Sequence, residues 1–263
     1  MNREFKSVIR SLFPRRVKKH RILGGPLRGG RIVTSWHDYP AAIVGRTERE
    51  LIHWFFENVR PGETWLDIGA HYGYTAIALS RLVGESGRVF AFEPLLSTSG
   101  CLTETRRLNR FSQLIVVPFG LSAPETLEMK TLPITRGMVD STMGSGETKE
   151  QNMSKRMTWV ETITVARLDW LWARICEDDQ RVHGIKIDVQ GMEIDVLRGM
   201  ENILRQNKPK LVVELHKGVD RKVFLNLIEL SGYLPIGVPV ETSGDEREPR
   251  YIDNRSYAFL PKC

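Results

Sequence analysis

Two short apolar runs, each carrying an acidic residue near its end, constrain the fold of this chain more than any other feature. The first is Trp65-Leu-Asp-Ile-Gly-Ala-His-Tyr-Gly73, and the second is Val89-Phe-Ala-Phe-Glu-Pro94. Apolar runs that alternate with glycine turns and helical patterns are typical of a parallel α/β sheet. Such a sheet binds its ligand at the carboxyl ends of the strands. The acids Asp67 and Glu93 therefore predict a site for a nucleoside-type cofactor.

The alternation continues along the chain and predicts an α/β, Rossmann-like fold. We expect a seven-stranded, mostly parallel sheet with helices on both faces and an antiparallel last strand. The expected strands cover residues 64–69, 88–92, 113–118, 184–189, 210–215, 234–239 and 256–260. The expected helices cover residues 74–83, 97–109, 193–206 and 219–231. An earlier helix is predicted by Thr47-Glu-Arg-Glu50, which has the pattern of a capping box.

The length of 263 residues suits one catalytic domain with an extension. We expect a basic N-terminal extension over residues 1–21 and a lead-in over 22–60 made of a strand, a turn and the capped helix. The catalytic domain would then cover 61–263, with a variable insertion at about 123–183.

Within that insertion, residues 125–132 and 158–165 are expected to form two extra strands. The polar stretch between Thr135 and Thr158 is long for a loop in a compact domain, which leaves a substrate lid and plain disorder as alternatives. A strand running into a helix is expected over residues 164–172.

The net charge of +6 belongs to the N-terminal extension. Residues 1–21 carry eight Lys or Arg against one Glu, so the remainder of the chain has a net charge of −1. We therefore expect no nucleic-acid partner, whereas weak contact between this tail and a membrane surface stays open.

No apolar run approaches the ~20 residues of a transmembrane helix. Three cysteines without a metal-binding spacing favour a cytoplasmic location.

The glycine pattern after the first strand decides which cofactor fits. A dinucleotide fingerprint needs a glycine where this chain has His71, so the approach of a pyrophosphate is not provided for. A cofactor of the S-adenosylmethionine kind needs only a tight turn, here Gly69-Ala70 to Gly73. We expect Asp67 either to order this turn or to meet the ammonium group of the cofactor.

The rest of the cofactor site follows from the next two strands. Glu93, followed by Pro94, is expected to accept hydrogen bonds from both ribose hydroxyls. The adenine would lie against the end of the third strand, at Phe119, Gly120 and Leu121. For Phe119, core packing is the alternative.

From about Glu48 to Leu260 the chain resembles the FkbM family of S-adenosylmethionine-dependent methyltransferases. The likeness is carried by Leu66-Asp-Ile-Gly-Ala-His-Tyr-Gly-Tyr-Thr75 with Phe92-Glu-Pro94, by Gly184-Ile-Lys-Ile-Asp-Val-Gln-Gly-Met-Glu193 with Val196-Leu-Arg-Gly199, and by Val213-Glu-Leu215. The resemblance implies the class I methyltransferase fold and O-methylation of a sugar, glycan or polyketide-type metabolite. The acceptor would then be a small molecule or a glycan. The family commonly has asparagine at position 71 and glutamate at position 190, where this chain has Gln190 as a substrate-binding candidate.

Three residues are the candidates for chemistry on the acceptor. Asp188 ends the fourth strand and is the first choice for a base. Glu214 and His216 lie at the end of the fifth strand, one residue apart, so their side chains point to the same side. Together the three could relay a proton or hold a divalent metal, and both alternatives stay open. Glu193 is expected only to interact favourably with a helix N-terminus.

Other functions also fit parts of this pattern. A nucleic-acid or protein methyltransferase could use the basic tail, and a non-catalytic S-adenosylmethionine-binding module would be consistent with Gln190. A nicotinamide dehydrogenase is disfavoured by the missing middle glycine. The sequence makes no prediction of oligomeric state.

Overall fold

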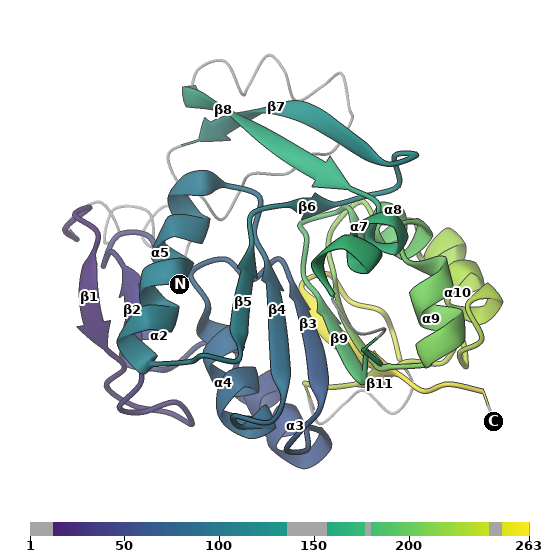
Figure 1. The fold of residues 1–263 in the computed structure, drawn as a ribbon, viewed down its shortest axis with the longest axis horizontal. Helices are drawn as coiled ribbons and strands as arrows, with labels where there is room; N and C mark the ends of the chain where they lie inside the picture. Colours follow the sequence, from purple (N-terminus) through teal and green to yellow (C-terminus); the bar gives the residue numbers. More distant parts are fainter. Residues whose placement is uncertain (1–12, 136–156, 177–179, 242–248, 263) are drawn as a thin grey trace.

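A computed structural model describes residues 13–135, 157–176, 180–241 and 249–262. At its centre lies a seven-stranded sheet with the order β11-β12-β10-β9-β3-β4-β5 (Figure 1). The strands are β3 (Thr64–Ile68), β4 (Arg88–Phe92), β5 (Leu114–Val117), β9 (Gly184–Ile187), β10 (Lys210–Leu215), β11 (Val238–Pro239) and β12 (Arg255–Phe259). All neighbours from β5 to β10 pair in parallel, and β12 is antiparallel to β10 and β11. The predicted mostly parallel sheet with an antiparallel last strand is confirmed.

Helices cover both faces of this sheet, which explains why its central strands are apolar on both sides. In β4, Phe90 and Phe92 join one core and the alternating Val89 and Ala91 join the other. The first core is closed by α7 (Leu168–Ile175), α8 (Glu193–Arg198), α9 (Glu201–Asn207) and α10 (Arg221–Leu230). The second is closed by α2 (Pro40–Val44), α3 (Arg49–Asn58), α4 (Tyr74–Val83) and α5 (Leu96–Asn109).

The helix expected over 193–206 is two helices, α8 and α9, which is a correction. The break lies at Gly199, where an added Cβ would come within 2.0 Å of the carbonyl oxygen of Ser122. Asp169 of α7 supplies a new start, because its carboxylate accepts hydrogen bonds from the backbone N–H groups of Asn202 and Ile203 at 3.1 Å. A contact made through space therefore caps α9, as a local cap would.

The predicted capping box at Thr47 is wrong. The N-cap of α3 is Glu48, which has a left-handed backbone at φ 52° and makes no side-chain cap bond. The Thr47 hydroxyl lies 3.4 Å from a Glu48 carboxylate oxygen instead of capping the helix. Both side chains line the cavity described below, so tertiary position prevails over the local capping pattern.

The lead-in packs against the sheet through α5. Strand β1 (Lys18–Arg21) pairs antiparallel with β2 (Arg31–Thr34). The backbone N–H of Val33 donates to Thr105 Oγ1 at 2.9 Å, which ties β2 to α5. Pairing between β1 and β2 thus crosses the boundary predicted between residues 21 and 22.

The insertion forms a separate three-stranded sheet over the carboxyl ends of the main strands (Figure 1, top). Its strands are β6 (Gly120–Leu121), β7 (Leu127–Thr135) and β8 (Met157–Ala166), and β7 and β8 form an antiparallel pair. The two extra strands and the strand that runs into α7 are confirmed. The interior of the predicted lid, residues 136–156, lies outside the described residues.

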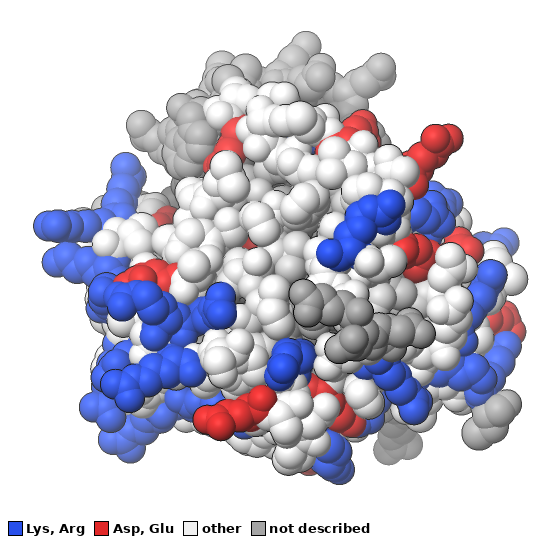
Figure 2. Space-filling view, in the orientation of Figure 1, with Lys and Arg blue, Asp and Glu red and all other residues white. Residues whose placement is uncertain are grey.

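Positive charge gathers on one side of the molecule. Figure 2 shows Lys and Arg concentrated where β1, β2 and α5 lie in Figure 1. We call this surface the basic face; its exposed members are Lys18, Lys19, Arg21, Arg31, Arg107 and Arg110. No helix within the described part of the chain has the length and apolar character needed to cross a membrane.

Candidate active site

A cavity of about 340 Å³ opens at the carboxyl ends of β3, β4, β9 and β10. Its roof comes from the insertion through Leu132 and Ile163, and one wall comes from the lead-in through Tyr39, Thr47 and Glu48. This is the position at which open α/β sheets bind their ligands. The volume is within the usual range for a small-molecule site, about 300–1,000 Å³.

The turn after β3 forms the floor of the cavity. Gly69 has φ +77°, and an added Cβ there would lie 1.8 Å from the carbonyl oxygen of Asp188. The N–H groups of Gly69 and Ala70 both donate to the carbonyl oxygen of Phe92 at 3.0 Å, which holds the turn against β4. Gly69 and Ala70 line the cavity, whereas Gly73 does not. An added Cβ at Gly73 would meet Leu102 of α5, so this glycine permits close helix packing.

Glu93 lies at the end of β4, where the ribose acid was expected. Its side chain lines the cavity and is 6% exposed. One carboxylate oxygen accepts the His71 N–H at 3.0 Å, and the other accepts the Leu95 N–H at 3.1 Å. Burial raises the pKa of Glu93 to about 7, although these two bonds lower it. Each oxygen retains acceptor capacity, so the fixed carboxylate can still receive two hydroxyl groups.

Asp67 does not line the cavity, and its carboxylate is fully buried beneath the turn. It accepts the Thr75 hydroxyl at 2.7 Å and lies 3.2 Å from the ammonium nitrogen of Lys186. These contacts are the ones expected if Asp67 orders the turn, and the structure shows no surface of Asp67 that faces a ligand.

The residues expected to contact the adenine lie along the cavity. Phe119, Gly120 and Leu121 line it beside Pro94. Phe119 is half-buried and packs against the main core, and contact with an adenine stays a prediction. The short strand β6 fixes this wall by pairing with β8.

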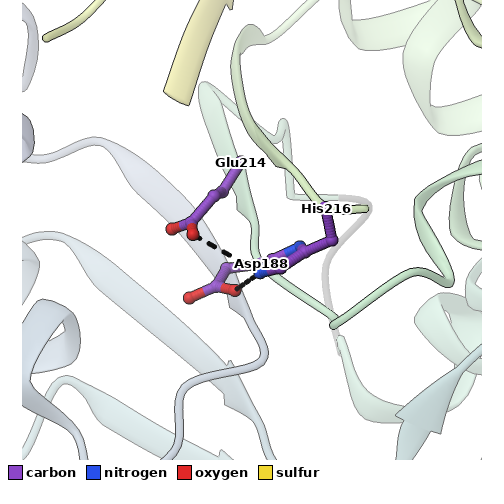
Figure 3. Close-up of side chains that lie close together, drawn as sticks. All are labelled: Asp188, Glu214 and His216. Carbon is purple, nitrogen blue, oxygen red and sulfur yellow. Dashed lines mark ion pairs between the residues drawn. The ribbon is translucent and has the colours of Figure 1, made fainter. Parts of the chain in front are cut away.

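The three predicted catalytic residues lie together at the carboxyl ends of β9 and β10 (Figure 3). The Nε2 atom of His216 is 3.5 Å from Asp188 Oδ1 and 3.4 Å from Glu214 Oε1. Asp188 and Glu214 line the cavity, while His216 is 5% exposed and lies behind them. Gln190 also lines the cavity, with its amide nitrogen 2.9 Å from His216 Nε2.

Glu193 contributes more to this site than the sequence indicates. It is fully buried at the start of α8, and its Oε1 atom is 2.7 Å from His216 Nδ1. The turn through Gln190 and Gly191, both with positive φ, brings Glu193 back to His216. Burial lowers the pKa of His216, but the hydrogen bonds to Glu193 and Glu214 outweigh it and raise the pKa to about 10.

Lys186 is a second residue that sequence reasoning missed. Its ammonium nitrogen lies 3.0 Å from the carbonyl oxygen of Gly69, 3.2 Å from Asp67 and 3.6 Å from Asp188. Burial lowers the pKa of Lys186, yet the charges of Asp67 and Asp188 raise it well above the usual value. Lys186 thus joins the cofactor turn to the candidate base. The signal was a lysine inside the otherwise apolar strand Gly184–Ile187.

Glu48 is the third residue of the site that sequence reasoning missed, and it reaches the cavity from the lead-in. Burial, together with the charges of Asp188 and Glu214, raises the pKa of Glu48 to about 7. No local pattern distinguishes Glu48 from an ordinary acid at the start of a helix, so the sequence alone does not indicate its place in the cavity.

Comparison with known proteins shows the family of the chain. A family model described as the methyltransferase FkbM domain matches residues 67–234. Hexuronic acid methyltransferase AglP of Haloferax volcanii is 28% identical over 186 residues, which cover 70% of this chain and 68% of AglP.

Solved structures resemble the chain only distantly. The methyltransferase FkbM of Methylobacillus flagellatus KT has a TM-score of 0.48 at 18% identity, covering 79% of this chain and 50% of its own. Aeropyrum pernix fibrillarin, solved with natively bound S-adenosyl-L-methionine, has a TM-score of 0.46 at 15% identity, covering 93% and 87%. Neither likeness carries an argument about activity. The family match spans more than half of the sequence, and the chain belongs to the FkbM family of S-adenosylmethionine-dependent methyltransferases.

Proposed function

We propose that the protein transfers a methyl group from S-adenosylmethionine to a hydroxyl of a sugar, glycan or polyketide-type metabolite. The observation that carries the proposal is one continuous cavity with Glu93 at one end and Asp188 at the other. A nucleoside and an acceptor can therefore lie end to end. The acceptor class is supported by AglP, which is named a hexuronic acid methyltransferase.

The residues present fit the cofactor. Gly69 and Ala70 would hold its amino-acid end, Glu93 its ribose, and Phe119 and Leu121 its adenine. The carboxylate of Glu93 is fixed by two backbone N–H groups, so it is already ordered when a ribose arrives. When bound, S-adenosylmethionine supplies a methyl carbon activated by a sulfonium leaving group.

Asp188 is proposed as the base. It accepts the hydrogen of the acceptor hydroxyl and keeps the proton while the new oxygen–carbon bond forms and the carbon–sulfur bond breaks. Lys186 and His216 hold its two oxygens from opposite sides. Holding the acceptor oxygen, the methyl carbon and the sulfur in line can supply roughly 7–11 kcal/mol, and a base adds about 10²–10⁴-fold. Gln190 is proposed to bind the acceptor beside it.

We also propose a cytoplasmic setting. Cys101 and Cys176 are free thiols in the structure, which agrees with a reducing compartment.

Two variants and one matched control test the proposal. D188N should slow methyl transfer about 10²–10⁴-fold and leave binding of S-adenosylhomocysteine unchanged, because Asp188 is proposed to act on the acceptor and not on the cofactor. E93Q should weaken that binding about tenfold or more, because hydrogen bonds to a charged group are worth about 1.5–3 kcal/mol. D195N, at a partly solvent-exposed position of α8, should change neither methyl transfer nor binding of S-adenosylhomocysteine.

Binding is measured by calorimetry, and turnover by the mass gain of one methyl group in a small-molecule extract of the host. Wild-type turnover by D188N would exclude Asp188 as the base. Absence of any heat with S-adenosylhomocysteine would refute the proposed function itself.

A further inference from the structure

Asp188, Glu214 and His216 present three metal-ligand atoms to one another at the acceptor end of the cavity (Figure 3). The two carboxylate oxygens and the imidazole nitrogen all lie within 4.8 Å of one another. Metal–ligand bonds of about 2.0–2.2 Å place neighbouring ligand atoms roughly 3 Å apart, close to the 3.4 and 3.5 Å seen at His216. Only small side-chain movements separate this arrangement from a coordination shell.

A residue outside the trio supplies an independent indication. Glu193 is fully buried and lies 2.7 Å from His216 Nδ1, on the side of the ring away from the carboxylates. This contact commits Nδ1 to Glu193 and leaves Nε2 facing Asp188 and Glu214. Metal-ligating histidines almost always have such a partner on the other ring nitrogen. The second oxygen of Glu193 has no hydrogen-bond partner among the described residues.

The charge around the trio also favours a cation. Glu48 lines the same cavity. Among the described lining residues Lys186 is the only Lys or Arg, and it is shared with the buried Asp67. Carboxyl groups therefore outnumber ammonium and guanidinium groups along this lining.

We infer that Asp188, Glu214 and His216 bind a divalent cation, with Glu193 as the outer carboxylate that orients the imidazole. Two carboxylates and one imidazole form a mostly hard donor set, which suits Mg²⁺ or Mn²⁺ with further positions left for oxygen ligands. His216 Nε2 cannot bind the ion while it carries a proton, so the ion and the proton compete for this nitrogen. The Gln190 amide, now 2.9 Å from that nitrogen, would have to turn away or present its oxygen.

The role of the ion rests on the proposed function. A cation at this place would orient two neighbouring hydroxyls of the acceptor and lower the pKa of the one that is methylated. Binding of the ion itself depends on neither methyl transfer nor the cofactor.

The test is a titration of the full chain with Mn²⁺ in the absence of cofactor. Free Mn²⁺ is followed by electron paramagnetic resonance, and Mg²⁺ is added as a competitor. We expect saturable binding of one ion per chain that Mg²⁺ displaces. D188N and H216Q should abolish binding, and E193Q should weaken it about 10–100-fold. D195N removes a carboxylate from the same helix and should leave affinity unchanged.

The titration of the wild-type protein tests the inference even if a variant fails to fold. Circular dichroism would show whether each variant is folded. No saturable Mn²⁺ binding would overturn the inference and leave the trio as an ion-pair network. Binding that a folded H216Q retains in full would place the ion elsewhere and also overturn it. A parallel titration with S-adenosylhomocysteine separates the two proposals, because each can fail while the other stands.

Discussion

At the scale of single residues, the active-site cavity is governed by an excess of carboxylates. Glu48, Glu93, Asp188 and Glu214 line it, and among the described lining residues Lys186 alone offers an ammonium group. Each added negative charge makes ionisation of the next carboxyl group less favourable. The protonation state of these carboxyl groups should therefore change the stability of the folded protein. Substitutions that remove one of the charged groups should change that stability as well.

Glu48 should destabilise the fold at alkaline pH. Its pKa is about 7 in the folded protein against an ordinary value of 4.5, so the folded state binds its proton more tightly. The associated stability is present below pH 4.5 and is lost as the pH rises through 7. E48Q should therefore raise Tm above pH 7, and the gain should disappear as the pH falls toward 4.5.

Thermal melts across that pH range check this prediction. E50Q, an exposed substitution in the same helix, should leave Tm unchanged throughout. Equal Tm values for E48Q and wild type at alkaline pH would contradict the raised pKa of Glu48, which burial and the neighbouring carboxylates cause.

Lys186 should be essential for stability, because its loss would leave Asp67 buried without its counter-charge. Breaking a buried pair from one side costs about 3–5 kcal/mol, so K186M should lower the free energy of unfolding by about that amount. The double variant D67N/K186M should recover part of the loss. K217M, an exposed lysine, should stay within about 0.5 kcal/mol of wild type.

Urea unfolding supplies these free energies. A K186M protein as stable as wild type would show that Lys186 does not compensate Asp67. A double variant no more stable than K186M would point to lost packing as the cause.

The site could be predicted from the sequence only where a residue ends a strand. Asp188, Glu214 and Glu93 were found in this way, because strand ends are visible as the last residues of apolar runs. Glu193 and Glu48 were not recognised, because they reach the site through turns with positive φ at Gln190 and at Glu48 itself. Such conformations are set by tertiary contacts and leave no periodic pattern.

At the scale of elements, the contact between the β3 turn and the end of β9 couples the two halves of the site. An added Cβ at Gly69 would lie 1.8 Å from the carbonyl oxygen of Asp188, so the two backbones touch. Any side chain at this position must push the cofactor turn away from the candidate base.

G69A should therefore impair cofactor binding and turnover together. Two effects add: a positive φ, which costs about 1–2 kcal/mol for a non-glycine residue, and a backbone clash. G218A is the matched control, since Gly218 has φ +93° and no atom near an added Cβ. Calorimetry with S-adenosylhomocysteine should show a loss for G69A only. Equal affinities for the two variants would mean that the clash is relieved without moving the turn.

The strands of the main sheet could be predicted because burial on both faces makes them continuous apolar runs. Strand β4, for example, begins and ends at the residues expected. The start of α3 and the break before α9 could not be predicted from the sequence, because they depend on contacts of Glu48 and Asp169 with residues distant along the chain. Division into residues 1–21, 22–60 and 61–263 stays a prediction.

At the scale of the whole molecule, positive and negative charge are separated. The basic face lies over β1, β2 and α5 (Figure 2). The carboxylates of Glu48, Glu93, Asp188 and Glu214 line the cavity. Among the described residues of this face, Glu104 is the acid that pairs with its cations, contacting Lys19 and Arg107. The remaining charge is available to an anionic surface such as a membrane.

We predict weak, salt-sensitive binding of the basic face to vesicles that contain phosphatidylserine. Each basic residue near such a surface is worth about 1 kcal/mol, so K18Q/K19Q/R21Q should weaken binding roughly 100-fold. Cosedimentation measures the bound fraction, with K217Q/K222Q as the matched control. Equal binding to uncharged phosphatidylcholine vesicles would contradict an electrostatic origin.

The wall that Tyr39, Thr47 and Glu48 contribute has a practical consequence. These residues precede the segment matched by the family model, which starts at residue 67. A fragment that begins at residue 67 would therefore lack this wall of the cavity. We predict that exchanging residues 39–48 between relatives alters the preference for the acceptor.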